Sequence, residues 1–291
     1  MDYTVALENN PKITDEQIND ILSQAQTLSL KNQNVDVYKK CFSYIDLTTL
    51  SSRDSQSSVE AFVTKAVEFP IHFPDVDNVA SVCVYPPFVE VAGLAIGGSN
   101  MAITSVSGGF PSSQTFIEVK MLETSMAVEN GADEIDIVIS IGEFLNGEYE
   151  LVASEVECIK DEIGDDAVLK VILETGELQD ANLIYKASML AMYAGADFIK
   201  TSTGKVAVSA TPEAAAVMCL AIKDYYNITG KKIGFKAAGG VATAADAAYY
   251  YSIVETVLGS EWLNAKYFRI GASSLASKLL SAIKGEQITY F

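Results

Sequence analysis

Short apolar segments alternate with longer helical segments along most of the chain. Runs rich in β-branched and aromatic side chains are typical of strands, and the segments between them carry helix signals. Eight strand–helix units in one chain predict an α/β fold, a (β/α)8 or TIM barrel. The predicted strands are residues 41–46, 80–84, 102–106, 134–138, 169–174, 198–200, 233–236 and 267–270.

The segments between these strands contain helix start signals. Thr211 is a candidate N-cap, followed by Pro212 at the first helical position, and Thr243 opens a second helix. An open doubly wound sheet is the alternative fold, and it would lead us to expect a Gly-x-Gly-x-x-Gly turn after the first strand. The sequence after residue 46 reads Leu-Thr-Thr-Leu instead, which favours the barrel.

Residues 1–36 are predicted to form a helical extension ahead of a catalytic barrel domain at residues 37–291. Thr14 and Gln17 match a capping box, which predicts a helix from this point to about Leu28. We expect this helix to pack on the outside of the barrel.

The net charge of the chain excludes two kinds of partner. The chain has 291 residues, 49% of them hydrophobic, and a formal net charge of -18. It therefore offers no basic field to neutralise the phosphates of nucleic acid or an anionic membrane surface, and neither partner is expected. A small anionic substrate would need a local site made of backbone N–H groups and a few lysines.

The cysteines and the N-terminal segment indicate the cellular compartment. No apolar signal region opens the chain, and no run of about 18 apolar residues suggests a membrane span. The cysteines form no CxxC pair and are widely spread: Cys41, Cys83, Cys158 and Cys219. These features predict a reduced cytoplasmic protein.

The chain has one histidine, His72, which excludes zinc sites built on histidine clusters. It stands between Pro70 and Pro74, in a predicted loop or strand start, where a structural role is expected. Acid–base chemistry must then fall to Asp, Glu, Lys, Tyr or water.

Ionisable side chains gather in four neighbouring predicted strands. Side chains alternate between the two faces of a strand, and barrel active sites lie at the carboxyl ends of the strands. The residues directed into the lumen or to its upper end are Asp136, Lys170, Glu174, Lys200 and Lys236. The alternative is a buried ion network that only fixes the barrel, but its desolvation cost makes such a network a poor stabiliser.

These residues predict a reactive amine. A lysine in water has a pKa near ~10.4 and is almost fully protonated at neutral pH. A second ammonium group nearby and partial desolvation favour the neutral amine, which can attack a carbonyl and form a Schiff base. Lys200 and Lys236 are both candidates for the nucleophile, and Asp136 is the candidate proton carrier.

Glycine-containing turns follow the last three predicted strands. Glycine lets backbone N–H groups approach an anion, and the last of these turns also opens a helix, whose N-terminus favours negative charge. The turns predict a phosphate site where barrels usually bind phosphate. They are Gly204-Lys205, Gly239-Gly240 and Gly271-Ala272-Ser273-Ser274.

The chain resembles the 2-deoxyribose-5-phosphate aldolases, a class I aldolase family, over roughly residues 41 to 280. The lysine-bearing stretches GADFIKTSTGK and GFKAAGGV are highly specific to this family. The resemblance implies reversible cleavage of 2-deoxy-D-ribose 5-phosphate to D-glyceraldehyde 3-phosphate and acetaldehyde, in deoxyribonucleoside catabolism and without metal or other cofactor. The matching stretches are residues 44–50, 82–86, 131–136, 169–178, 195–205, 234–241 and 271–274.

The resemblance also implies roles for single residues. Lys200 becomes the Schiff-base lysine, Lys236 the second lysine that lowers its pKa, and Asp136 the aspartate of a proton relay. A homodimer is the assembly that the family suggests. The residues placed near the substrate and its phosphate are Asp46, Thr203, Gly204, Lys205, Gly239, Gly240, Gly271, Ser273 and Ser274.

Departures from the family pattern keep other functions open. Many members have arginine after Gly-Gly-Val, whereas this chain has Ala242, so one cationic phosphate contact is missing. The N-terminal extension is longer than in short members, and Tyr290 is a candidate counterpart of a tyrosine that assists proton transfer in some members. The alternatives are another Schiff-base aldolase, transaldolase-like or with a non-phosphorylated acceptor, and, less favoured, a non-catalytic sugar-phosphate-binding protein.

Overall fold

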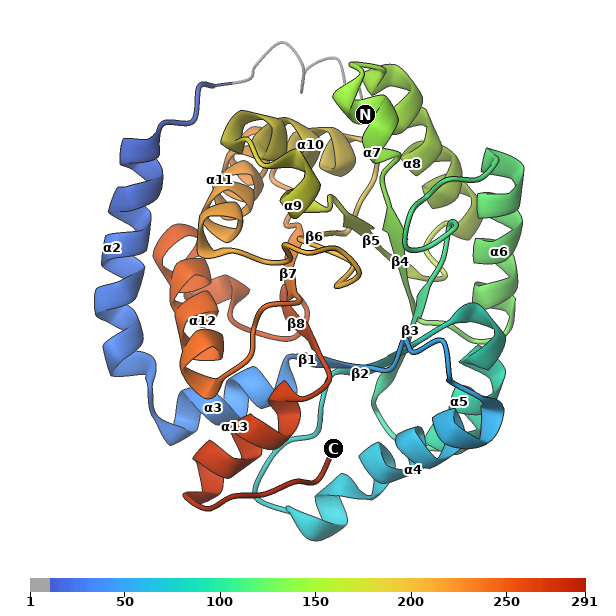
Figure 1. The fold of residues 1–291 in the computed structure, drawn as a ribbon, viewed down its shortest axis with the longest axis vertical. Helices are drawn as coiled ribbons and strands as arrows, with labels where there is room; N and C mark the ends of the chain where they lie inside the picture. The colour runs from blue at the N-terminus through green and yellow to red at the C-terminus, as the bar shows by residue number, and fades with distance from the viewer. Residues whose placement is uncertain (1–10) are drawn as a thin grey trace.

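A closed barrel of eight parallel strands forms the centre of the molecule (Figure 1). The computed structural model describes residues 11–291. The strands pair in sequence order, and β8 closes the ring against β1. The predicted (β/α)8 barrel is confirmed, and the open sheet is excluded. The strands are β1 (Ile45–Thr48), β2 (Ser81–Val84), β3 (Ala102–Val106), β4 (Glu134–Val138), β5 (Val168–Ile172), β6 (Phe198–Lys200), β7 (Gly234–Ala238) and β8 (Phe268–Ala272).

Helices surround the barrel and connect successive strands (Figure 1). Within residues 11–291 we find no helix long and apolar enough to cross a membrane. The helices, with the 3-10 turns labelled η, are α2 (Asp15–Asn32), α3 (Val35–Ser43), α4 (Gln56–His72), η1 (Pro86–Phe88), α5 (Val89–Ile96), α6 (Ile117–Glu129), α7 (Ile141–Leu145), α8 (Tyr149–Ile163), α9 (Thr175–Leu178), α10 (Ala181–Tyr193), α11 (Pro212–Thr229), α12 (Ala244–Leu258), η2 (Ser260–Trp262) and α13 (Leu275–Lys284).

Local sequence signals set several helix starts where they were predicted. Thr14 and Gln17 form a capping box that satisfies two backbone N–H groups at the start of α2. Thr211 caps α11, whose first residue is a proline, and Thr243 and Asp246 form a capping box at α12. Helices α11 and α12 begin directly after the loops that follow strands β6 and β7. Their caps therefore also fix where those loops end.

Helix α2 packs along the outside of the barrel, against α12 and α11. It is the blue helix on the left of Figure 1. Its last residue, Asn32, donates hydrogen bonds of 2.9 Å to Ser252 Oγ and Glu255 Oε2 of α12, so the helix continues past its predicted end near Leu28. The domain boundary after residue 36 stays a prediction; α3 spans this position. Residues 1–10 of the predicted extension lie outside the described residues.

The first predicted strand is wrong for most of its length. Cys41 and Phe42 belong to helix α3, and β1 begins only at Ile45. Asn34 caps this helix by accepting a hydrogen bond from the Val37 N–H group, and Cys41 and Phe42 are fully buried on it. A short apolar run does not distinguish a buried helical turn from a strand by its pattern alone. Here the cap and the packing decide for the helix.

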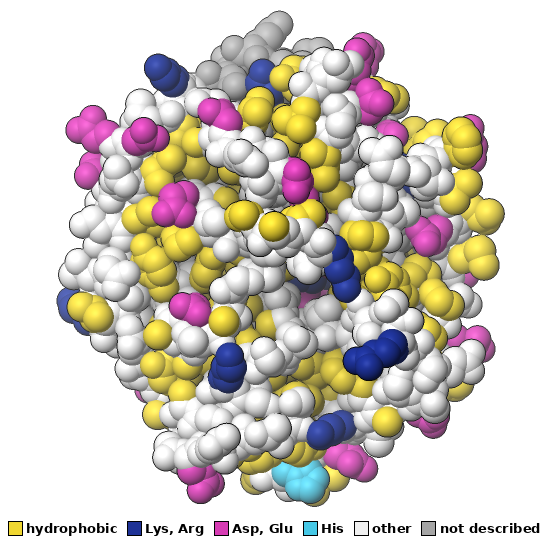
Figure 2. All heavy atoms as spheres, in the orientation of Figure 1, with side chains coloured by type: hydrophobic (Ala, Val, Ile, Leu, Met, Phe, Trp, Pro, Cys, Tyr) yellow, Lys and Arg dark blue, Asp and Glu magenta, His cyan; other side chains and the backbone are white. Residues whose placement is uncertain are grey.

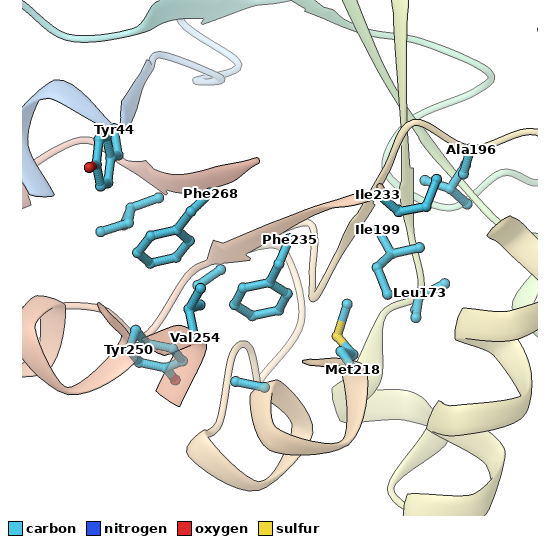
Figure 3. Close-up of a cluster of buried hydrophobic side chains, with 14 of the residues drawn as sticks. Tyr44, Leu173, Ala196, Ile199, Met218, Ile233, Phe235, Tyr250, Val254 and Phe268 are labelled. Atoms are coloured by element: carbon cyan, nitrogen blue, oxygen red, sulfur yellow. The ribbon is translucent and has the colours of Figure 1, made fainter. Parts of the chain in front are cut away.

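The hydrophobic core lies between the outer face of the barrel and the helices. In Figure 3, Phe235 of β7 and Phe268 of β8 lie beside Val254 of α12 and Met218 of α11. All four side chains are fully buried, and burying a side chain of this size stabilises the fold by roughly 1.5–3 kcal/mol. This outer layer holds the strands in place and leaves the inner face of the barrel for other side chains.

Candidate active site

A set of linked charged side chains fills the barrel lumen. They are contributed by β1 and by β4 through β8, and each is at most 7% exposed. Strand register explains why they meet, because Asp136 lies level with Lys170, and Lys200 lies level with Lys236 on the neighbouring strand. Residues at the same level of a parallel pair point to the same face. The lumen set is Asp46, Glu134, Asp136, Lys170, Lys200, Lys236 and Arg269.

Asp136 contacts all three lysines of the lumen set. Its Oδ1 accepts a hydrogen bond of 3.1 Å from Lys170 Nζ. Its Oδ2 accepts two, 2.7 Å from Lys200 Nζ and 2.8 Å from Lys236 Nζ. Burial opposes ionisation of this carboxyl group, but the three lysines hold its pKa well below the usual range. Asp136 is therefore an ionised carboxylate that brings the nitrogens of Lys200 and Lys236 close together.

Arg269 lies at the amino-terminal end of the lumen, where its Nε donates to the Ala265 carbonyl. Its guanidinium group also donates to Asp46 Oδ1 at 2.5 Å and to Glu134 Oε1 at 2.7 Å. Lys236 Nζ lies 2.5 Å from the other oxygen of Asp46. Each carboxylate thus has a cationic partner, which offsets part of the desolvation cost of burying charge.

The three lysines differ in their affinity for a proton. Burial lowers the pKa of Lys200; Asp136 opposes this shift, and the charge of Lys236 adds to it. Burial acts on Lys236 in the same direction, but Asp136 and Asp46 outweigh it and raise its pKa. Lys170 is likewise kept charged by its carboxylate partners. Lys200 is therefore the lysine of this set that most readily becomes a neutral amine.

A cavity of about 350 Å³ lies over Lys200 at the carboxyl end of the barrel. The space-filling view shows a hollow near the centre of this face (Figure 2). Of the lumen set, Lys200 lines the cavity, whereas Lys236 and Asp136 are fully buried and do not line it. The lining residues are Thr48, Leu50, Lys200, Thr203, Gly204, Lys205, Ala238, Gly239, Gly240, Val241, Ala242, Gly271, Ala272, Ser273, Ser274 and Leu275.

The cavity brings together the predicted substrate and phosphate residues, with one exception. Asp46 does not line the cavity, because it is fully buried against Lys236 and Arg269. It can act on a bound molecule only through those partners. The predicted residues that line the cavity are Thr203, Gly204, Lys205, Gly239, Gly240, Gly271, Ser273 and Ser274.

Packing favours glycine at two of these positions. Gly239 has a φ of +71°, and a Cβ atom there would lie 2.5 Å from the Cβ of Ser209 in the preceding loop. Gly271 lies beside Lys236, and a Cβ atom there would approach the Lys236 Cε to 3.1 Å. A larger residue at Gly271 would therefore displace a lysine of the lumen set.

Glu174 is not part of the lumen set, contrary to its predicted direction. Strand β5 ends at Ile172, and Glu174 adopts a left-handed backbone conformation with a φ of +53°. Its carboxylate accepts hydrogen bonds from Thr203 in the loop after β6. Burial raises the pKa of Glu174, and the hydrogen bonds from Thr203 oppose the shift.

Tyr290 is placed away from the cavity. Its hydroxyl donates to the Lys65 carbonyl at 2.9 Å, and its ring contacts Phe69 and Phe73. His72 lies beside the same ring, exposed at the last position of α4 rather than in the predicted loop or strand. The prediction failed because Pro70 is accommodated inside this helix. In this structure neither Tyr290 nor His72 contacts the lumen set.

Sequence reasoning missed several residues of the site, among them Arg269, Thr48 and Leu50. Arg269 had a signal, since it alternates with buried apolar neighbours in the last predicted strand. Thr48 and Leu50 line the cavity from the end of β1, and the Leu50 carbonyl accepts a hydrogen bond of 2.5 Å from Lys205 Nζ. That contact joins loops far apart in the sequence, so spacing alone did not indicate it.

The fold and the site define a barrel enzyme whose cavity is built over a lysine amine. A family model described as DeoC/LacD family aldolase matches residues 40–256, and the chain belongs to this family. The family resemblance inferred from the sequence is thus confirmed, and with it the class of enzyme, an aldolase acting as a carbon–carbon lyase.

Named relatives and solved structures agree with this family. A human protein named deoxyribose-phosphate aldolase is 44% identical over 252 residues, which cover 82% of this chain and 78% of that protein. A mouse protein of the same name is 45% identical over 251 residues, with the same coverage. A structure of deoxyribose phosphate aldolase from Aeropyrum pernix, described as tetrameric, has a TM-score of 0.67 at 27% identity and covers 91% of this chain and 97% of its own.

Proposed function

We propose that this aldolase reversibly cleaves 2-deoxy-D-ribose 5-phosphate to D-glyceraldehyde 3-phosphate and acetaldehyde through a Schiff base on Lys200. The observation that carries the proposal is the position of Lys200, which lines the cavity and donates to Asp136, the carboxylate to which Lys236 also donates. The names of the human and mouse relatives support the substrate. The proposed setting is deoxyribonucleoside breakdown in the cytoplasm.

The proposed chemistry begins with the neutral amine. Lys200 Nζ attacks the C1 aldehyde of the open-chain sugar, and loss of water gives an iminium ion. Removal of the C3 hydroxyl proton breaks the C2–C3 bond, releases D-glyceraldehyde 3-phosphate and leaves the electron pair in an enamine on Lys200. Protonation at C2 and hydrolysis then release acetaldehyde and restore the amine.

Asp136 and Lys236 have separate parts in this proposal. Asp136 accepts a hydrogen bond from Lys200 Nζ at 2.7 Å, so it is placed to carry protons to and from that nitrogen, directly or through water. Lys236 stays protonated because Asp46 and Asp136 both contact it. Its positive charge favours the neutral form of Lys200.

The opposite side of the cavity is proposed to bind the phosphate. Backbone N–H groups of the loops after β7 and β8 and the N-terminus of α13 are suited to an anion, and Ser273 and Ser274 add hydroxyl donors. Ala242 lines the same part of the cavity and supplies no charge. This position favours the second candidate function, an aldolase of the same mechanism that accepts non-phosphorylated aldehydes.

Reductive trapping tests the proposed nucleophile. Borohydride added with acetaldehyde should reduce the Schiff base and fix an ethyl group on Lys200, detected by peptide mass spectrometry. The adduct should be lost in Lys200→Ala and kept in Lys223→Ala, because Lys223 is an exposed lysine on α11. An adduct that survives Lys200→Ala would refute the mechanism.

Rates on deoxyribose with and without the 5-phosphate then separate the two candidate substrates, and equal rates would count against the phosphorylated one.

A further inference from the structure

The turn after β5 carries a buried acidic residue that the proposed mechanism does not use. Glu174 is 1% exposed and has a φ of +53°, a left-handed conformation that is unfavourable for a residue other than glycine. Such backbone strain persists only where the surrounding structure holds it. The contacts of the Glu174 side chain show what holds it here.

Both oxygens of the Glu174 carboxylate face Thr203, three residues after Lys200. The Thr203 N–H group donates to Oε1 at 3.1 Å, and the Thr203 hydroxyl donates to Oε2 at 2.5 Å. One residue further on, the Thr175 N–H group donates to the Thr201 carbonyl at 2.9 Å. The turn after β5 and the loop after β6 are therefore tied by side-chain and backbone hydrogen bonds.

Helix α9 packs directly on the backbone of the same loop. A Cβ atom on Gly176 would lie 2.0 Å from the Val208 carbonyl oxygen, so no other residue fits there without movement. On the other side, Gly239 approaches Ser209 closely, as described above. The loop after β6 is thus held between two neighbouring segments, and Thr203 has a fixed place in the cavity wall.

The hydrogen bonds of the Thr203 hydroxyl can be assigned completely. A hydroxyl group has one proton and can accept two hydrogen bonds. The proton points to Glu174, because the Thr203 hydroxyl donates to Glu174 Oε2. One acceptor position is used by the Lys205 N–H group at 3.0 Å. What remains for a molecule in the cavity is a single acceptor position.

We propose that Glu174 is a positioning residue that fixes the Thr203 hydroxyl as a hydrogen-bond acceptor, so that the site selects acceptor aldehydes carrying a hydroxyl group. The inference rests on the proposed function, since it names a substrate class for the same site. A hydroxyl group on the aldehyde can donate to Thr203, whereas an ether oxygen at the same place cannot.

A change of one atom in Glu174 reverses this arrangement. In Glu174→Gln, the amide oxygen must stay with the Thr203 N–H group, because a backbone donor cannot reverse. The amide nitrogen then faces the Thr203 hydroxyl, which must accept from it and turn its proton toward the cavity. The variant therefore converts the acceptor that faces the substrate into a donor, without changing the size of the side chain.

The test measures condensation of acetaldehyde with 2-hydroxypropanal and with 2-methoxypropanal. The wild type should prefer the hydroxy aldehyde, and Glu174→Gln should reduce the ratio of the two kcat/KM values about tenfold, the effect of one hydrogen bond. Glu177→Gln is the matched control, because Glu177 is an exposed residue of α9 and should leave the ratio unchanged. A Glu174→Gln protein with both rates lowered and the ratio of the two kcat/KM values as in the wild type would overturn the proposal, because that result indicates only general damage to the fold.

A second variant keeps the test independent of the stability of Glu174→Gln. Thr203→Val removes the hydroxyl group and should reduce the same ratio, and Glu174→Gln added to it should have no further effect. Borohydride trapping of acetaldehyde on Lys200, measured in the wild type and in Glu177→Gln, checks the proposed function separately. If the wild type is trapped at Lys200 but the ratio of the two kcat/KM values is the same in the wild type and the variants, only the inference about Glu174 is refuted. If the wild type forms no adduct at Lys200, the proposed function is refuted as well.

Discussion

Two lysines of the same lumen differ in the direction of their pKa shifts because one of them contacts an additional carboxylate. Lys200 and Lys236 lie level on neighbouring strands and donate to the same oxygen of Asp136. Lys236 also lies 2.5 Å from Asp46, whereas within residues 11–291 Lys200 forms an ion pair with Asp136 alone and lines the cavity. Asp46 therefore acts at a distance from the cavity by keeping the proton on Lys236. The difference assigns the neutral amine to Lys200.

Replacing Lys236 by leucine should raise the pKa of Lys200. The repelling charge is removed, and Asp136 is left to stabilise the ammonium form of Lys200. The acidic limb of the kcat/KM profile should therefore move upward by at least about one pH unit, with activity at pH 7 reduced about tenfold or more and partly recovered at higher pH. Lys223→Leu should leave the profile unchanged. An unshifted acidic limb in Lys236→Leu would show that Lys236 does not depress the pKa of Lys200.

The sequence predicted the members of the lumen set better than their roles. Alternation along β4 and β5 was enough to direct Asp136 and Lys170 inward, because it depends only on strand geometry. It could not distinguish Lys200 from Lys236, since both stood at the ends of neighbouring predicted strands. The contact that distinguishes them joins Asp46 of β1 to Lys236 of β7, and such a contact depends on closure of the barrel. Only the family resemblance named Lys200.

At the scale of elements, the loop after β7 lines the part of the cavity that we propose to bind the phosphate. It contributes Gly239, Gly240 and Ala242 to the lining, and its end is fixed because Asp246 accepts hydrogen bonds from the N–H groups of Ala242 and Thr243. The loop is therefore preformed by its own helix cap. The side chain at position 242 is exposed, so it can be replaced without disturbing this cap.

Replacing Ala242 by arginine should favour phosphorylated substrates. A guanidinium group at this position can form a charge-assisted hydrogen bond to a phosphate in the cavity. We expect the ratio of kcat/KM for deoxyribose 5-phosphate to that for deoxyribose to rise about tenfold. Ala242→Gln, which adds a long side chain without charge, should change the ratio much less. An unchanged ratio in the arginine variant would indicate that the phosphate does not bind beside this loop.

The end of the fifth strand could not be predicted from the sequence pattern. The apolar run at residues 169–174 was read as one strand, which directed Glu174 into the lumen. The strand ends two residues earlier because the chain turns to place the Glu174 carboxylate on Thr203. This turn has no glycine at the left-handed position, so no local signal marks it. By contrast, β3, β4 and β6 match their predicted bounds.

At the scale of the whole molecule, the lumen set makes the stability of the folded state depend on the ionisation of its carboxyl groups. Asp46, Glu134 and Asp136 are each at most 4% exposed, and cationic partners outweigh burial and lower the pKa of each. In the unfolded chain these groups have ordinary pKa values near ~4. Between pH ~4 and the lower pKa values of the folded state, the unfolded state therefore binds more protons.

The free energy of unfolding should thus be almost constant from pH 7 to pH 5 and should fall steeply below pH ~4, by up to about 1.4 kcal/mol per pH unit for each of the three carboxyl groups. Urea unfolding followed by circular dichroism at pH 7, 5, 4 and 3 measures this dependence. Asp46→Asn should be less stable at pH 7, because it leaves Lys236 and Arg269 short of a partner, yet its decline below pH ~4 should be shallower. Asp165→Asn, at an exposed position, should follow the wild type. If Asp46→Asn declines as steeply as the wild type, then protonation of the lumen set is not what limits stability in acid, and the surface carboxylates of this acidic chain must account for it.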